Sequence, residues 1–204
     1  MLRLYRQPEK GEFFVIFGDC AQGGSDSNFV QFLSKSATDI PLVLQVKDVA
    51  ASMTPLLHQA AEWIFDKTQI KPVVALERNN GGASEMERLR VLNRLDKYKL
   101  YYMKRDGKET DKLGFITDQV SRPKMIGDWK VAFDSQGITI YDEETIKQHR
   151  QFITNKSNRP EAAPNTHDDA VISCAGAYQL FLTENPISIP KRTRPQRPKV
   201  RLHL

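Results

Sequence analysis

The chain has 204 residues, a length that suits one compact domain with its own hydrophobic core. It contains no run of about 18 apolar residues, and its first ten residues are charged and polar, without the apolar stretch of a signal peptide. These features argue against a membrane or secreted protein and predict a soluble, intracellular one.

The formal net charge of +5 comes from the C-terminal end of the chain. From Ile187 onward there are six basic residues and no acid, whereas the rest of the chain holds 24 basic and 25 acidic residues. Because this end is also rich in proline, we expect residues 1–184 to form the folded domain and residues 185–204 a disordered basic tail. The tail is compatible with a solvated terminus and equally with an arm that binds DNA or a partner.

Cysteine and histidine usage gives no sign of a zinc site. The two cysteines, Cys20 and Cys174, are expected to be reduced thiols in or near the core. The four histidines do not combine with them in a zinc-binding pattern.

Three strands are predicted at the start of the domain. Residues Glu12–Gly18 contain a continuous apolar run, typical of a strand buried on both faces, and Asp19 follows it. A Gly- and Ser-rich turn is expected at Ala21–Asn28, and strands are expected at Phe29–Leu33 and Leu42–Val49. Together these segments predict an antiparallel meander.

Helices and strands alternate in the rest of the domain. Apolar residues recur at helical spacing over Thr54–Lys67, with Thr54 as the expected N-cap and Pro55 at the first helical position. Pro72–Leu76 is expected to be a strand parallel to its neighbour, because a helix precedes it, and Glu77 stands at its end. The remaining expected elements are a helix at Gly82–Asp96, a strand at Leu100–Met103, an exposed loop or hairpin at Lys104–Val120, a helix at Pro123–Phe133, a strand at Ile138–Tyr141, a helix at Glu143–Ile153, a polar loop at Asn155–Asn165 and a closing helix from Thr166 to about Thr183.

This order of elements predicts an α/β fold with a mixed sheet, in which the three-strand antiparallel meander is joined by parallel strands and helices cover both faces. An acid that follows a buried strand is costly to desolvate unless it is paired or holds a cation, and two neighbouring strands deliver Asp19 and Glu77. The closing helix adds Asp168 and Asp169 near its start. If that helix crosses the sheet, the four carboxylates meet in an all-oxygen site that suits Mg²⁺ or Mn²⁺.

Each acid also has an ordinary explanation. Asp19 fits the start of a Gly-rich turn, and Asp168 and Asp169 would complement a helix dipole, with Thr166 and Asp169 as a capping box. Capping, however, requires one acid rather than two, and turn chemistry does not explain Glu77 directly after an apolar strand. Taken together, the four acids favour a metal site.

Several sequence blocks between Glu12 and Leu182 carry a family resemblance. They are Gly18-Asp19 with Gly23-Gly24-Ser25-Asp26, then Ala75-Leu76-Glu77-Arg78-Asn79-Asn80-Gly81-Gly82, then Leu113-Gly114-Phe115-Ile116-Thr117 with Arg122-Pro123, and last Thr166-His167-Asp168-Asp169-Ala170. This set resembles the nuclease domain of the large terminase subunit of tailed double-stranded DNA phages, a family with the RNase H-like fold. Together, the Glu77–Gly82 block and the closing Asp-Asp-Ala helix are fairly specific for this family. Either one alone would not be.

The resemblance implies a metal-dependent endodeoxyribonuclease that cuts concatemeric viral DNA during genome packaging. By position it implies that Asp19, Glu77, Asp168 and Asp169 are catalytic and bind two Mg²⁺ or Mn²⁺ ions, with Asp169 as the firmer ligand and Asp168 as an accessory or second-metal ligand. Two-metal hydrolysis of the phosphodiester, with Asp19 bridging the ions, would then need no side-chain nucleophile.

The resemblance also implies partners and a location. The partners are double-stranded DNA, the portal protein, the small terminase subunit and an N-terminal ATPase domain, and the location is the host cytoplasm, transiently at the procapsid portal. No Gly-x-x-x-x-Gly-Lys-Ser/Thr loop occurs in this sequence, so we expect it to be the nuclease part alone. A membrane is not among the expected partners.

Basic side chains near the acids are expected to contact DNA phosphates largely without regard to base sequence. The candidates are Lys104, Arg105, Lys112, Arg122 and Lys124. Charged loops are more often simply solvated, so an ordinary surface role stays open for them. Arg78 is a candidate for orienting the carboxylates, and residues 79–82 are expected to form a tight strand-to-helix turn.

Three alternatives stay open. They are another RNase H-like nuclease of the resolvase or transposase type, a phosphate loop of the actin-like ATPase kind, and a non-catalytic module that binds DNA or the portal. The Glu77–Gly82 block argues against the first, the length of the chain against the second, and the presence of all four acids against the third.

Overall fold

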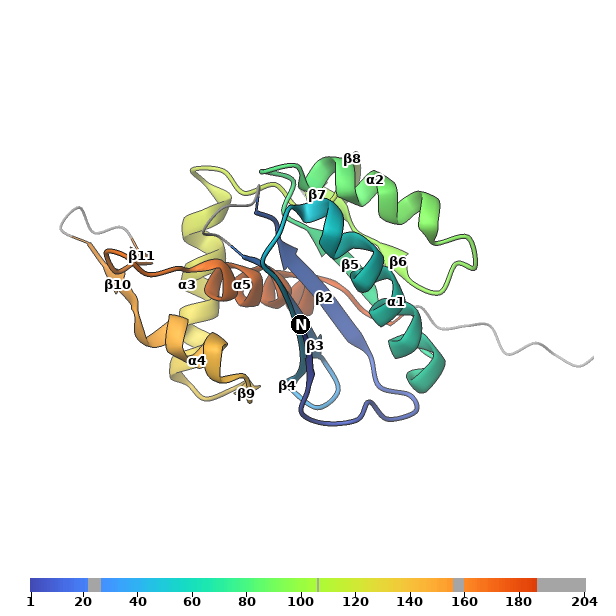
Figure 1. The fold of residues 1–204 in the computed structure, drawn as a ribbon, viewed down its shortest axis with the longest axis horizontal. Helices are drawn as coiled ribbons and strands as arrows, with labels where there is room; N and C mark the ends of the chain where they lie inside the picture. The colour runs from blue at the N-terminus through green and yellow to red at the C-terminus, as the bar shows by residue number, and fades with distance from the viewer. Residues whose placement is uncertain (22–26, 106, 156–159, 187–204) are drawn as a thin grey trace, which may run out of the picture.

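A mixed β-sheet forms the centre of the computed structural model, which describes residues 1–21, 27–105, 107–155 and 160–186 (Figure 1). The strand order is β1-β4-β3-β2-β5-β6, and β9 also pairs with β4. These strands are β1 (Leu2–Leu4), β2 (Phe14–Asp19), β3 (Asn28–Ser34), β4 (Asp39–Val46), β5 (Val73–Leu76), β6 (Lys99–Leu100) and β9 (Thr139–Ile140). The expected turn residues 22–26 and the tail from residue 187 lie outside the described residues.

The predicted meander and the predicted parallel pairing are both confirmed. Strand β2 pairs antiparallel with β3, which pairs antiparallel with β4, while β2 and β5 are parallel. The register places Gly18 opposite Leu76, so the next residues, Asp19 and Glu77, leave the sheet at the same edge. The register of two buried strands therefore brings the first two acids together.

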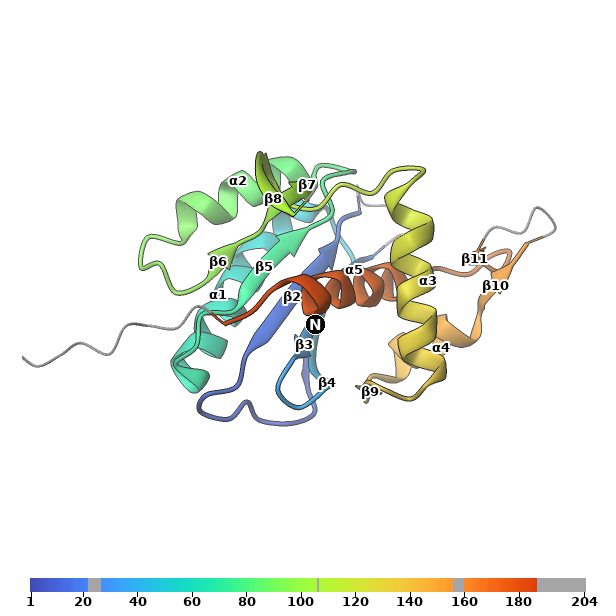
Figure 2. The ribbon, with the colours of Figure 1, turned by 180° about the vertical axis from the view of Figure 1, so that it is seen from behind.

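Helices cover both faces of the sheet, as predicted (Figures 1 and 2). On one face lie α1 (Ala50–Thr68) and α2 (Gly82–Leu92); on the other, α5 (Asp169–Thr183) crosses β2 and β3, and α3 (Ser121–Asp134) and α4 (Glu143–Arg150) pack against α5. Because side chains alternate along a strand, β2 contributes Phe14 and Ile16 to the first interface and Val15 and Phe17 to the second.

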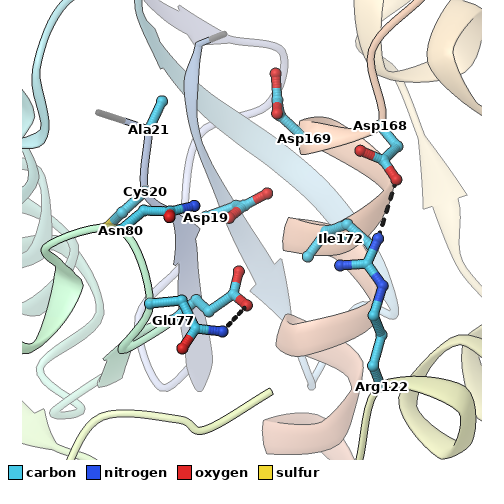
Figure 3. Close-up of a pocket in the computed structure, with 10 residues that line it drawn as sticks. Asp19, Cys20, Ala21, Glu77, Asn80, Arg122, Asp168, Asp169 and Ile172 are labelled. Atoms are coloured by element: carbon cyan, nitrogen blue, oxygen red, sulfur yellow. Dashed lines mark hydrogen bonds and ion pairs between the residues drawn. The ribbon is translucent and has the colours of Figure 1, made fainter. Parts of the chain in front are cut away.

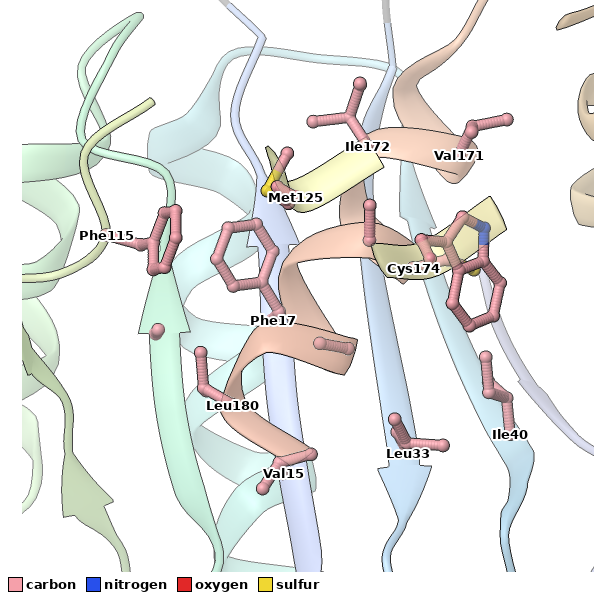
Figure 4. Close-up of a cluster of buried hydrophobic side chains, with 14 of the residues drawn as sticks. Val15, Phe17, Leu33, Ile40, Phe115, Met125, Val171, Ile172, Cys174 and Leu180 are labelled. Atoms are coloured by element: carbon pink, nitrogen blue, oxygen red, sulfur yellow. The ribbon is translucent and has the colours of Figure 1, made fainter. Parts of the chain in front are cut away.

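Strand β2 is accordingly buried throughout, and its residues from Phe14 to Phe17 are all apolar, because both of its faces are covered. Figure 4 shows the second interface, where Val15, Phe17 and Leu33 of the sheet meet Ile172 and Leu180 of α5. Each fully buried side chain of this size contributes roughly 1.5–3 kcal/mol to folding.

The close fit of α5 on β2 depends on a glycine. A Cβ atom at Gly176 would lie 2.3 Å from the ring of Phe17, so no larger residue fits there without moving the helix. The position of α5 over the sheet is therefore set by contact with β2, and so is the position of its first turn.

Two predictions for the N-terminal half were wrong. Strand β1 was not expected, and it adds to the sheet edge by placing Leu2 and Leu4 opposite residues of β4. Helix α1 begins at Ala50 rather than at Thr54, and Pro55 lies inside it. Proline has no amide hydrogen to donate to the carbonyl of Ala51, and the guanidinium of Arg88 in α2 donates to that oxygen instead, at 3.2 Å.

Later element boundaries also differ from the prediction. Helix α2 ends at Leu92 rather than Asp96, because the Asn93 side chain bonds the backbone of Lys97 and Tyr98. The expected helix to Ile153 ends at Arg150, and its last residues lie in β10 (Phe152–Thr154), which pairs with β11 (Pro160–Ala162) within the expected loop. The hairpin expected in the charged segment is present as β7 (Tyr102–Arg105) and β8 (Lys108–Leu113).

Both cysteines are free and buried, as predicted. Among the described helices, none is long and apolar enough to cross a membrane.

Candidate active site

Two buried carboxyl groups meet where β2 and β5 leave the sheet. Asp19 is the last residue of β2, and the backbone amide of Glu77, directly after β5, donates to the carbonyl of Gly18 at 2.9 Å. Only 9% of Asp19 and 6% of Glu77 is exposed, and the two carboxyl groups lie side by side. Since ionised carboxylates are acceptors only, such a pair has to share a proton or hold a cation.

The surroundings raise the pKa of Asp19 well above its ordinary value. Burial is the largest cause, followed by the hydrogen bond and the charge of Glu77 and then by the charges of Asp169 and Asp168. Burial disfavours the charged form of a carboxyl group, and like charges disfavour it further. The local field at Asp19 is therefore strongly negative, which is the field that attracts a cation.

Glu77 is held in place by a side chain that sequence reasoning assigned only to a turn. The amide nitrogen of Asn79 donates to Oε1 of Glu77 at 3.0 Å, to the carbonyl of Thr117 at 3.1 Å and to its hydroxyl at 2.8 Å. The expected tight turn is confirmed, because Asn80 and Gly81 have positive φ angles of 52° and 90° and α2 starts at Gly82. Asn79 therefore connects the Glu77 carboxylate to the chain after β8.

Asp168 and Asp169 lie across the pocket from this pair, at the start of α5 (Figure 3). The amide of Ser27 donates to Oδ2 of Asp169 at 3.3 Å. Arg122 of α3 donates to Oδ2 of Asp168 at 3.1 Å. Burial raises the pKa of Asp168. The negative charge of Glu77 raises it further, whereas the positive charge of Arg122 lowers it.

The four predicted acids line a single pocket of about 850 Å³, together with Asn79, Asn80 and Arg122. Within the described ranges, however, no three His, Cys, Asp or Glu side chains stand close enough to hold a metal ion as they are placed. The structure thus brings the residues to one pocket without a preformed coordination sphere. The donor set of carboxylate and amide oxygens, with a buried pair that has no cationic partner among the described residues, fits Mg²⁺ or Mn²⁺, which also retain waters as ligands.

The five basic candidates for DNA contacts are dispersed. Arg122 lines the acidic pocket. Lys124 pairs with Asp128 in the next turn of α3, and Lys104 pairs with Glu184 beyond the C-terminal end of α5, at the opposite end of that helix from the acids. Arg105 and Lys112 lie on the exposed β7–β8 hairpin, as polar side chains of a surface strand pair.

Among the described residues, Arg78 bonds backbone carbonyls rather than a carboxylate. Its guanidinium donates to the carbonyl of Leu113, and its amide donates to Phe115 at 2.8 Å. It therefore connects the end of β5 to the chain that follows β8.

The described sheet, with α5 crossing β2 and β3, gives this chain the RNase H-like α/β fold. Among solved structures, this fold is similar to large terminase nuclease domains. The nuclease domain of the Thermus phage P74-26 large terminase is 12% identical and has a TM-score of 0.64, over 90% of this chain and 87% of that one. The large terminase nuclease from thermophilic phage G20c, solved with bound magnesium, is 14% identical with a TM-score of 0.60, over 87% of this chain and 84% of that one.

A viral protein from outside the phages shares the fold as well. The human cytomegalovirus terminase nuclease domain is 16% identical with a TM-score of 0.52, over 83% of each chain. No protein-family model and no curated protein sequence matches this chain. At these identities the likeness establishes the fold.

Proposed function

We propose that residues 1–184 form a terminase-type nuclease domain, an endonuclease that cuts concatemeric viral DNA during genome packaging. The observation that carries the proposal is the buried Asp19–Glu77 pair, which faces Asp168 and Asp169 in one pocket. The fold of the terminase nucleases supports it, as does the magnesium bound to the G20c domain. The same proposal implies double-stranded DNA, the portal protein, the small terminase subunit and an ATPase domain as partners, in the host cytoplasm.

The four acids would hold two divalent ions, Mg²⁺ or Mn²⁺. The chemistry that such ions supply is activation of a water and stabilisation of the leaving oxygen of the phosphodiester. Asp19 would be the central ligand because it comes from the central strand β2, and Asn79 orients Glu77 by donating to its Oε1. Asp169 extends from the first turn of α5 and would be a ligand, and Asp168, one of whose oxygens bonds Arg122, would be an accessory or second-metal ligand.

Incubation of the purified protein with supercoiled plasmid tests this function. We expect nicked and linear DNA in Mn²⁺ or Mg²⁺ and intact plasmid when a chelator is present. A folded protein that leaves the plasmid intact in both metals would contradict the proposal and favour a non-catalytic DNA- or portal-binding module. Cutting that persists in the chelator would contradict the metal requirement.

Arg122 is the candidate best placed to hold a DNA phosphate, since it lines the acidic pocket and is 40% exposed. Each phosphate that a protein neutralises changes the slope of log K against log salt by about 0.9. We therefore expect Arg122→Gln to weaken binding of a short duplex and to reduce this slope by about one, measured by fluorescence anisotropy in chelator at several salt concentrations.

Lys104→Gln is the matched control, because Lys104 is a partly buried cation paired with Glu184, at the other end of α5. We expect it to leave both the affinity and the salt slope unchanged. Equal effects of the two substitutions would show that Arg122 has no special place in DNA binding.

A further inference from the structure

In the described part of the chain, the N-cap residue of α5 does not cap this helix with its own side chain. The first amides of a helix have no partner within the helix and need an acceptor from elsewhere. Asp168 occupies the N-cap position of α5 but makes no side-chain cap hydrogen bond, because its carboxylate turns to Arg122. Thr166, the expected cap, instead donates its hydroxyl to the carbonyl of Ala163 at 2.7 Å, and α5 begins at Asp169.

A side chain from α4 supplies the missing acceptor. Oε1 of Gln148 accepts from the amide of Ala170, the residue directly after Asp169, at 2.8 Å. Gln148 is only 3% exposed, and its amide nitrogen faces Oε1 of Glu144 at 3.5 Å. A neutral amide is suited to this position, because it accepts a hydrogen bond without adding another negative charge beside the acids of the pocket.

The helix that carries Gln148 is itself fixed to the sheet. Its N-cap residue, Asp142, accepts from the amide of Thr145 at 2.8 Å and from its hydroxyl at 2.7 Å, and also from the hydroxyl of Tyr5 at 2.7 Å and from Arg3 at 3.1 Å. The hydroxyl of Thr145 in turn accepts from the amide of Gln31, in the middle of β3, at 3.1 Å. Both sides of the acidic pocket are therefore fixed to the same sheet. Asp19 and Glu77 are fixed through the ends of β2 and β5, and Asp168 and Asp169 are fixed through α4.

We propose that Gln148 is a positioning residue of the acidic pocket. Its side-chain carbonyl holds the first turn of α5, so that Asp168 and Asp169 line the pocket opposite Asp19 while the Asp168 carboxylate bonds Arg122 instead of capping the helix. The inference rests on the proposed function, since it takes these carboxylates to be metal ligands.

Three variants test the role of Gln148. Gln148→Met keeps the length of the side chain but removes the acceptor, and Gln148→Glu retains an accepting oxygen at the same place. Tyr98→Phe is a control for general loss of a buried hydrogen bond, because Tyr98 is 1% exposed and its hydroxyl donates to the carbonyl of Leu89 on the opposite face of the sheet.

The measurements are Mn²⁺ affinity, from the paramagnetic resonance signal of free Mn²⁺, and hydrogen exchange of the Ala170 amide. Loss of a group that orients metal ligands typically weakens metal affinity 10- to 100-fold, so we expect Gln148→Met to bind Mn²⁺ about 10-fold more weakly and to exchange this amide faster. Gln148→Glu, which keeps the accepting oxygen but adds a charge, should restore slow exchange of the Ala170 amide, and Tyr98→Phe should lower stability with unchanged Mn²⁺ affinity. Should Gln148→Met fail to fold, Gln148→Asn, which withdraws the amide by one methylene, takes its place with the same expectation.

One set of results would refute only the role of Gln148, and another would refute the proposed function as well. Wild-type Mn²⁺ affinity in folded Gln148→Met, or an equal loss in Tyr98→Phe, would refute the positioning role alone. A wild-type protein that binds no Mn²⁺ at all would refute the proposed function, and this inference with it.

Discussion

We expect Asp19→Asn to abolish DNA cleavage while leaving the metal-free protein at least as stable as the wild type. The carboxyl group of Asp19 is buried beside Glu77, and burial together with three neighbouring acids raises its pKa. Asparagine has nearly the same shape, and it removes a group whose charged form is disfavoured at this place. The substitution therefore relieves repulsion in the metal-free protein and deletes the proposed bridging ligand.

Thermal unfolding with and without Mn²⁺, combined with plasmid nicking, separates these effects. In the wild type, Mn²⁺ at about 100 times its Kd should stabilise the fold by about 2.7 kcal/mol, and this gain should disappear in Asp19→Asn. Cleavage should fall by more than about 100-fold, beyond the loss usual for residues that merely orient metal ligands.

Asp66→Asn is the control for Asp19→Asn, because Asp66 is half exposed and pairs with Lys97 far from the pocket. It should behave as the wild type in both measurements. Near-normal cutting by Asp19→Asn would rule out the assignment of this residue.

Local sequence patterns were enough to predict one half of the site, the pair Asp19 and Glu77. The apolar runs before Asp19 and Glu77 predicted two adjacent buried strands, and the parallel register then placed the two acids side by side. The placement of Asp168 and Asp169 opposite them required the position of α5 on the sheet, which sequence periodicity does not give. The family resemblance supplied that expectation, and all four residues line one pocket, although among the described residues no three acids stand close enough to hold an ion as they are placed.

Two helix starts were predicted wrongly for the same physical reason. The capping rules that favoured Thr54 and Thr166 assume that a helix finds its first partners in its own chain segment. In the fold, Arg88 of α2 donates to the carbonyl of Ala51, which Pro55 leaves without its helical partner. The amide of Ala170 donates to Gln148 of α4. Partners so distant in sequence leave no local signal, and the same is true of the bond from Asn79 to the Thr117 carbonyl.

We expect Gly82→Ala to destabilise the protein strongly, because the first residue of α2 lies directly against the backbone of Glu77 at the end of β5. A Cβ atom at Gly82 would lie 1.8 Å from the carbonyl oxygen of Glu77 and 3.2 Å from the sulfur of Cys20. The oxygen belongs to the backbone, and the adjoining amide of Glu77 is bonded to Gly18, so neither can move without disturbing the strand ends. We expect a loss of about 3 kcal/mol or more in the free energy of unfolding, at the upper end of overpacking effects.

Urea unfolding followed by circular dichroism measures this loss, and Gly127→Ala provides the matched control. Gly127 is exposed inside α3, and a Cβ atom there would meet nothing within 4 Å. Because alanine is the better helix former, this control should stabilise the protein by up to about 1 kcal/mol. In the fraction of Gly82→Ala that still folds, Glu77 has to shift, so Mn²⁺ binding should weaken as well. A Gly82→Ala protein that unfolds at the wild-type urea concentration would show that the approach of α2 to Glu77 is not a constraint on the site.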